Sequence, residues 1–98
     1  MARFDVYELG GGSLVVDVQS DLLPPMATRI VIPLAPATVA PRVFEGLNPR
    51  LVVDGETYTL ITQQMSAVSS NALHRRVLSL SKEADQIARA IDYVLYGF

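Results

Sequence analysis

The sequence changes its hydrophobic period about four-fifths of the way along the chain, and this change limits the folds available to it. Before Leu80, apolar residues occur in short runs that alternate with polar residues or end at glycine and proline, a pattern typical of β-strands. From there on, apolar residues recur mostly at the three- and four-residue intervals of one helical face, at Leu80, Ala84, Ile87, Ile91, Val94 and Leu95. We therefore predict several short strands followed by one helix over Lys82–Leu95, in a small β-barrel or α+β fold.

The residues that flank this segment favour a helix that begins and ends at its boundaries. Ser81 precedes the helix, and a serine hydroxyl can accept a hydrogen bond from a backbone N–H of the first turn. Gly97 follows it, where a residue in the left-handed conformation commonly ends a helix. We predict Ser81 as the N-cap and Gly97 as the terminating residue.

The N-terminal third contains three strand-like runs. Arg3–Tyr7 alternates apolar and polar residues as a half-buried strand does, and Leu14–Val18 follows it across the turn Gly10–Ser13. This glycine turn lacks the Gly-Lys-Ser/Thr ending of a phosphate-binding loop, so we interpret it as the connection of a hairpin. The β-branched run Arg29–Ile32 predicts a third strand, which Pro33 should end or place at a sheet edge.

A second hairpin gives the strongest local signal. The runs Leu51–Val53 and Thr57–Ile61 flank Asp54 and Gly55, a pair that tolerates the positive φ angles of a tight hairpin turn. Residues 63–72 are polar and small, and they show no firm period.

Composition excludes several classes of protein. A chain of 98 residues is long enough for one domain, and half of its residues are apolar, which excludes intrinsic disorder. The apolar excess also suggests a surface covered by a partner, such as a homodimer. The absence of cysteine excludes disulfides, thiolate zinc sites and a thiol nucleophile. A net charge of −2 disfavours direct nucleic-acid binding. Without a signal peptide or a membrane-spanning run, the expected location is the cytoplasm.

Two groups of polar residues are weak candidates for chemistry. The carboxylates of Asp17 and Asp21 could bind a hard cation, but a calcium loop needs more oxygen ligands than these two supply. We therefore favour a strand end, with Asp21 capping the following turn. His74, followed by Arg75 and Arg76, has the residue types of a ribonuclease site. No second acid or base is tied to it, so we favour an exposed histidine in a polar loop.

The terminal residues Tyr96, Gly97 and Phe98 allow two interpretations. In one, Phe98 packs back on Tyr93 or on the barrel as part of the helix terminus. In the other, the aromatic pair is a wedge offered to a partner, because tyrosine supplies a large contact area with little rotamer entropy to lose. The residues alone leave both open.

A series of segments, none specific by itself, occurs in a characteristic order: Leu14–Leu23, Arg29–Leu34, Asn48-Pro49, Gly55-Glu56, Met65–Val68, Leu80-Ser81 and an aromatic-Gly-apolar end. In this order, over nearly the whole chain, they resemble the CcdB toxins of plasmid addiction modules. The resemblance implies one domain over residues 1–98, a mostly β, α+β fold that is an SH3-like small β-barrel of the CcdB/Kid/MazF type with a long C-terminal helix. It also implies a homodimer without catalytic activity, cofactor or metal.

The resemblance further implies two partners and their contact residues. CcdB toxins bind the A subunit of DNA gyrase and trap its cleaved complex with DNA, and a CcdA antitoxin removes them. The gyrase wedge, Trp-Gly-Ile in the family, falls on Tyr96, Gly97 and Phe98 here. The family's helix contacts fall on Asp92 and Leu95, which replace asparagine and phenylalanine. The isoleucine pair that anchors the antitoxin falls on Leu22 and Leu23.

Two alternatives stand beside this hypothesis. One is a member of the family that dimerises and binds an antitoxin but is inactive on gyrase or has another target. The other is an endoribonuclease like the MazF and Kid toxins, which would use His74 with Arg75 or Arg76. The acidic charge balance disfavours this second alternative.

Overall fold

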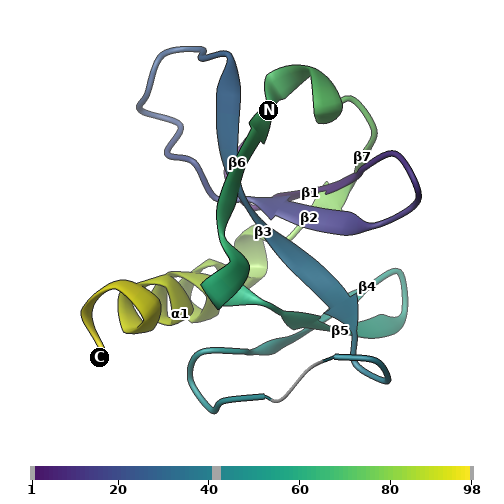
Figure 1. Ribbon diagram of the computed structural model, residues 1–98, viewed down its shortest axis with the longest axis vertical. Helices are drawn as coiled ribbons and strands as arrows, with labels where there is room; N and C mark the ends of the chain where they lie inside the picture. The colour runs from purple at the N-terminus through teal and green to yellow at the C-terminus, as the bar shows by residue number, and fades with distance from the viewer. Residues whose placement is uncertain (1, 41–42, 98) are drawn as a thin grey trace.

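The computed structural model describes residues 2–40 and 43–97 and shows a curled antiparallel sheet with a helix at its side (Figure 1). Seven strands, three short 3-10 turns and one α-helix occur in the described residues. The strands are β1 (Asp5–Glu8), β2 (Leu14–Asp17), β3 (Thr28–Pro36), β4 (Arg50–Val53), β5 (Glu56–Leu60), β6 (Ser66–Ser69) and β7 (Arg76–Ser79). The 3-10 turns are η1 (Thr62–Gln64), η2 (Ser70–Ala72) and η3 (Ser81–Glu83), and the helix is α1 (Ala84–Tyr96).

The sheet order is β4-β5-β3-β2-β1-β7, and β6 pairs with the first half of β3. Figure 1 shows β3 crossing the middle of the molecule, with β1 and β2 on one side and β4 and β5 on the other. Such a mostly β, α+β arrangement with a C-terminal helix confirms the predicted fold class. Both predicted hairpins are present, β1–β2 and β4–β5. Asp54 and Gly55 have φ angles of 51° and 79°, as the tight turn requires.

Pro33 neither ends the strand nor lies at an edge, so that prediction was wrong. β3 continues through it to Pro36 and lies in the interior of the sheet. The carbonyl of Pro33 accepts a hydrogen bond from the N–H of Ile61, so the proline nitrogen faces the same side of the strand. On that side β3 changes partner, from β6 at residues 28–31 to β5 at residues 34–36. A missing N–H at this change of partner removes no bond from either ladder.

Burial differs from the predicted alternation in β1. Phe4, Asp5, Val6 and Tyr7 are all buried, because the main core cluster covers one face and a smaller cluster covers the other. The strands β6 and β7 were not predicted. Their short segments contain serine and arginine, and pairing with β3 and β1 determines their conformation rather than a hydrophobic pattern.

The helix begins later than predicted and lacks the predicted cap. Ser81 opens the 3-10 turn η3, and its own N–H donates to Ser79 Oγ at 3.1 Å, so it is not the N-cap of α1. Gly97 ends the helix as predicted, with a φ of 83° and its N–H donating to the Tyr93 carbonyl. Ile87 is fully buried against the core, whereas Leu95 is 62% exposed and does not belong to the buried stripe. No helix in the described residues is long and apolar enough to cross a membrane.

Candidate functional site

The C-terminal end of α1 forms an exposed face, which we call the terminal face: Asp92, Leu95, Tyr96 and Gly97. Leu95 and Tyr96 are 62% and 67% exposed. Gly97 closes the helix in the left-handed conformation, and open space surrounds the position where a Cβ would lie. The last turn of α1 lies at the outer edge of the molecule (Figure 1). Phe98, the last residue of the predicted wedge, lies outside the described residues.

The predicted antitoxin residues lie on the loop between β2 and β3. Leu22 is 96% exposed and Leu23 is 49% exposed. Leu23 borders an open pocket of about 460 Å³, together with Met26, Arg29 and Ser70. Ser70 ties the loop to η2, because its Oγ donates to the Met26 carbonyl. The loop therefore presents apolar side chains from a tethered backbone.

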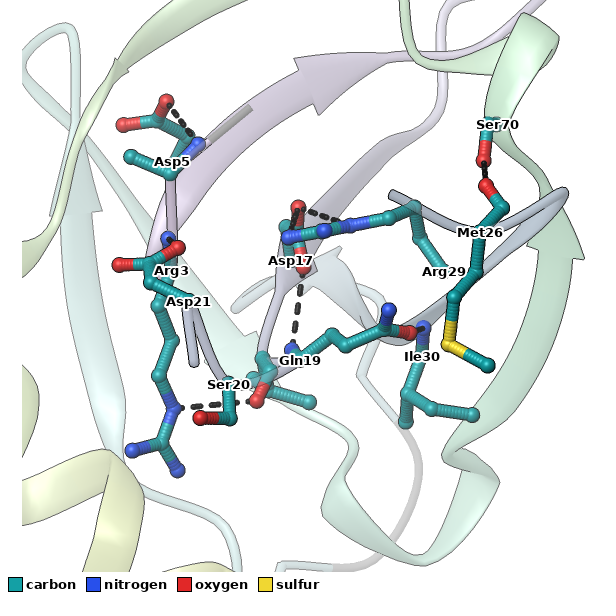
Figure 2. Close-up of polar contacts among 12 residues, drawn as sticks. Arg3, Asp5, Asp17, Gln19, Ser20, Asp21, Met26, Arg29, Ile30 and Ser70 are labelled. Carbon is teal, nitrogen blue, oxygen red and sulfur yellow. Dashed lines mark hydrogen bonds and ion pairs between the residues drawn. The ribbon is translucent and has the colours of Figure 1, made fainter. Parts of the chain in front are cut away.

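A buried ion pair holds the strands from which this loop departs (Figure 2). Arg29 on β3 donates from Nε to Asp17 Oδ2 on β2 at 2.9 Å, and its Nη2 lies 2.7 Å from the same oxygen. Asp17 is fully buried and Arg29 is nearly so. Nε has hydrogen-bond geometry, and Nη2 contributes a close charge contact without it. The guanidinium lies against the carboxylate and offsets part of the cost of removing it from water.

Further hydrogen bonds connect this pair to the start of the loop. Asp17 Oδ1 accepts from the N–H of Gln19, and Gln19 Oε1 accepts from the N–H of Ile30. Arg3 donates from Nε to the Val18 carbonyl and from its N–H to Asp21 Oδ1. We call Arg3, Asp17, Gln19, Asp21 and Arg29 the polar clamp.

Asp17 is the last residue of β2, so the predicted strand end is confirmed, but the polar clamp corrects the interpretation of Asp21. Asp17 is occupied by Arg29, and Asp21 accepts from Arg3 rather than capping the following turn, where Ser20 Oγ accepts from the Leu22 N–H instead. The signal for the ion pair was present in the sequence as an acid between the apolar residues Val16 and Val18. Burial raises the pKa of the nearby Tyr7 phenol, and the carboxylates of Asp5 and Asp17 raise it further.

His74 is exposed, as predicted, and its Nδ1 lies 3.0 Å from the Asn71 carbonyl. Because a carbonyl only accepts, Nδ1 carries the proton in this contact. The two neighbouring arginines turn toward β1. Arg75 Nη1 lies 3.2 Å from Glu8 Oε1. Arg76 Nε lies 3.1 Å from Oδ2 of the buried Asp5 carboxylate. Both cations are therefore partly neutralised by the chain's own acids.

Comparison with known families decides the relationship. The family model of the CcdB protein matches residues 3–97, nearly the whole chain. The chain belongs to the CcdB family. CcdB proteins are toxins rather than a family of catalysts. Membership agrees with the order of segments seen in the sequence and with the strand-then-helix architecture.

Solved structures share the CcdB fold at low sequence identity. One is an endoribonuclease in complex with its cognate antitoxin from a mycobacterial species, with a TM-score of 0.79 and 13% identity, covering 97% of this chain and 94% of that chain. Another is an endoribonuclease from a mycobacterial species, with a TM-score of 0.76 and 13% identity, covering 97% and 90% of the two chains. At this identity the likeness shows the fold alone.

The residues that the CcdB resemblance assigns to two partners lie in two places. Asp92, Leu95, Tyr96 and Gly97 share the end of α1, and Leu22 and Leu23 share the β2–β3 loop. Figure 1 shows this loop at the upper left and the end of α1 at the lower left. The fold thus separates the predicted gyrase contacts from the predicted antitoxin contacts.

Proposed function

We propose that this protein is the toxin of a type II toxin–antitoxin module, a single domain that binds the A subunit of DNA gyrase and traps the gyrase–DNA cleavage complex. The observation that carries the proposal is the terminal face. Tyr96 is the last residue of α1, directly before the terminating Gly97, and it is 67% exposed. A tyrosine on a rigid helix end offers a large contact area at a small entropic cost, as interface anchors do. The damage comes from the trapped gyrase, and the toxin catalyses nothing itself.

We further propose that the toxin is a cytoplasmic homodimer, neutralised by a CcdA-like antitoxin that contacts Leu22 and Leu23. Family membership and the solved complex of a protein of this fold with its antitoxin support an antitoxin partner. Exposed apolar side chains on several loops, among them Leu22, Met26, Val39 and Phe44, support contact surfaces beyond the terminal face.

A gyrase cleavage assay tests the main proposal. Purified protein is incubated with gyrase, ATP and supercoiled plasmid. We expect linear DNA with the wild type and none with Tyr96→Ala. Tyr96 is mostly exposed, so the variant should fold with an unchanged melting temperature. Linear DNA from the folded variant would contradict the role of the wedge. No linear DNA from a folded wild type would favour a family member that is inactive on gyrase or has another target.

An endoribonuclease is the second candidate, favoured by the exposed His74 beside Arg75 and Arg76. It has less support, because each of these arginines already pairs with a carboxylate on β1. Cleavage of RNA by the purified protein that is lost in His74→Ala would establish this activity in place of gyrase poisoning.

A further inference from the structure

The arginines of the described residues divide into two groups. Arg29, Arg75 and Arg76 each pair with a carboxylate. The Arg3 side chain donates from Nε to the Val18 carbonyl, and its guanidinium lies 4.7 Å from the centre of the Phe4 ring.

Arg50 and Arg89 form the second group. Neither has an ion pair or a hydrogen bond from its side chain within residues 2–40 and 43–97. Both are exposed, and both line one groove. The chain has a net charge of −2, and Glu45 lines the same groove, yet within the described residues neither arginine forms an ion pair.

The groove lies between the segment Val43–Arg50 and α1, and we call it the arginine groove. Its volume is about 640 Å³, within the range of ligand-binding clefts. Asn48 makes one wall rigid: it is buried, accepts from the Phe44 N–H, and donates to the Leu60 carbonyl and to Gln63. The arginine groove is therefore a built feature rather than a gap under a loose loop.

The arginine groove leads toward the terminal face. Arg89, Tyr93 and Tyr96 are four and then three residues apart, so they lie along one face of α1. The Tyr93 ring packs over Gly46, where a Cβ would lie 3.6 Å from two ring carbons. A partner that grips Tyr96 thus meets Tyr93 and then Arg89 along the same helix.

We propose that the arginine groove takes acidic side chains of the gyrase A subunit, as a second contact beside the terminal face. This inference rests on the proposed function. Arginine binds a carboxylate through two parallel hydrogen bonds, and Val43 and Pro49 add apolar contact beside the cations. Continuity with the terminal face assigns the groove to gyrase rather than to the antitoxin, whose predicted residues lie on another loop. Two arginines are too few to neutralise the successive phosphates of a nucleic-acid backbone, which favours a single acidic side chain over DNA.

Charge reversal tests the proposal. Affinity for the purified A subunit of gyrase is measured for the wild type, Arg50→Glu, Arg89→Glu and the control Lys82→Glu, over a range of salt concentrations. Lys82 precedes the same helix, is exposed and lies outside the groove, so its reversal changes the net charge equally. We expect each groove variant to bind about tenfold more weakly and with a shallower salt dependence, and the control to bind within about twofold of the wild type. Antitoxin affinity should not change in any of them.

The outcomes separate the two proposals. If the wild type binds the A subunit of gyrase and the groove variants bind equally well, the arginine groove is not a gyrase contact and the proposed function stands. A loss of antitoxin affinity alone would assign the groove to the antitoxin and overturn the proposal. A loss seen with the gyrase–DNA complex but not with the isolated A subunit would assign it to DNA and also overturn it. If the folded wild type binds no gyrase, both the proposed function and this inference fail.

Discussion

The polar clamp and the arginine groove contain the same residue type in opposite situations. Arg29 is 7% exposed and lies against the fully buried Asp17, whereas Arg50 and Arg89 are exposed in an open groove. In the clamp, the chain satisfies its own charges and joins two strands. At the groove and the adjoining terminal face, cationic and aromatic side chains are exposed instead. The difference separates an arginine that stabilises the fold from two that we propose for recognition.

Breaking the clamp should have the largest effect on stability. We expect Asp17→Ala to lower the free energy of unfolding by about 3–5 kcal/mol, because it leaves the Arg29 guanidinium buried without its counter-ion. Urea unfolding followed by circular dichroism measures this change. Asp21→Ala is the matched control, since Asp21 is exposed and accepts one backbone hydrogen bond, and it should cost about 1 kcal/mol or less. Equal losses in the two variants would contradict the distinction between them.

The helix allows the same comparison for apolar side chains. Ile87 is fully buried, and Ile91, one turn later, is only partly buried against the same core. We expect Ile87→Ala to cost about 2–5 kcal/mol, and Ile91→Ala to cost less, because part of its side chain already contacts water. The same unfolding measurement decides this. A larger loss at Ile91 would mean that something outside this chain, such as a second copy, covers that side chain.

Sequence patterns predicted the fold where local rules and tertiary packing agree. The Asp54-Gly55 turn and the Gly97 terminus formed as expected, since each depends on a backbone conformation that its own residues favour. The predictions for Pro33 and Ser81 failed because each depended on neighbours. Pro33 is accommodated because β3 changes its strand partner there. Ser81 begins a 3-10 turn, and its N–H donates to Ser79 Oγ. Register and pairing of this kind are set by tertiary contacts.

The candidate sites were predictable only in part. The CcdB resemblance assigned partner contacts to the terminal face and the β2–β3 loop, and the described residues of both are exposed. The arginine groove was not predicted, because Arg50 and Arg89 are distant in sequence and neither lies in a motif. The acid inside the run Leu14–Val18 signalled a buried pair, but its partner Arg29 is identified only once β2 and β3 are aligned.

The smallest effect on stability is expected at the β2–β3 loop and the terminal face. A substitution at each should weaken the binding of a different partner. Leu22→Ala and Tyr96→Ala should each change the free energy of unfolding by no more than about 0.5 kcal/mol, because both side chains are mostly exposed. Leu22→Ala should weaken binding of a CcdA-like antitoxin and leave binding to the gyrase A subunit unchanged, since the β2–β3 loop lies away from the C-terminus. Tyr96→Ala should weaken gyrase binding. Calorimetric titration of both variants with both partners measures this, and a variant that loses both partners equally while remaining folded would show that the two surfaces act as one.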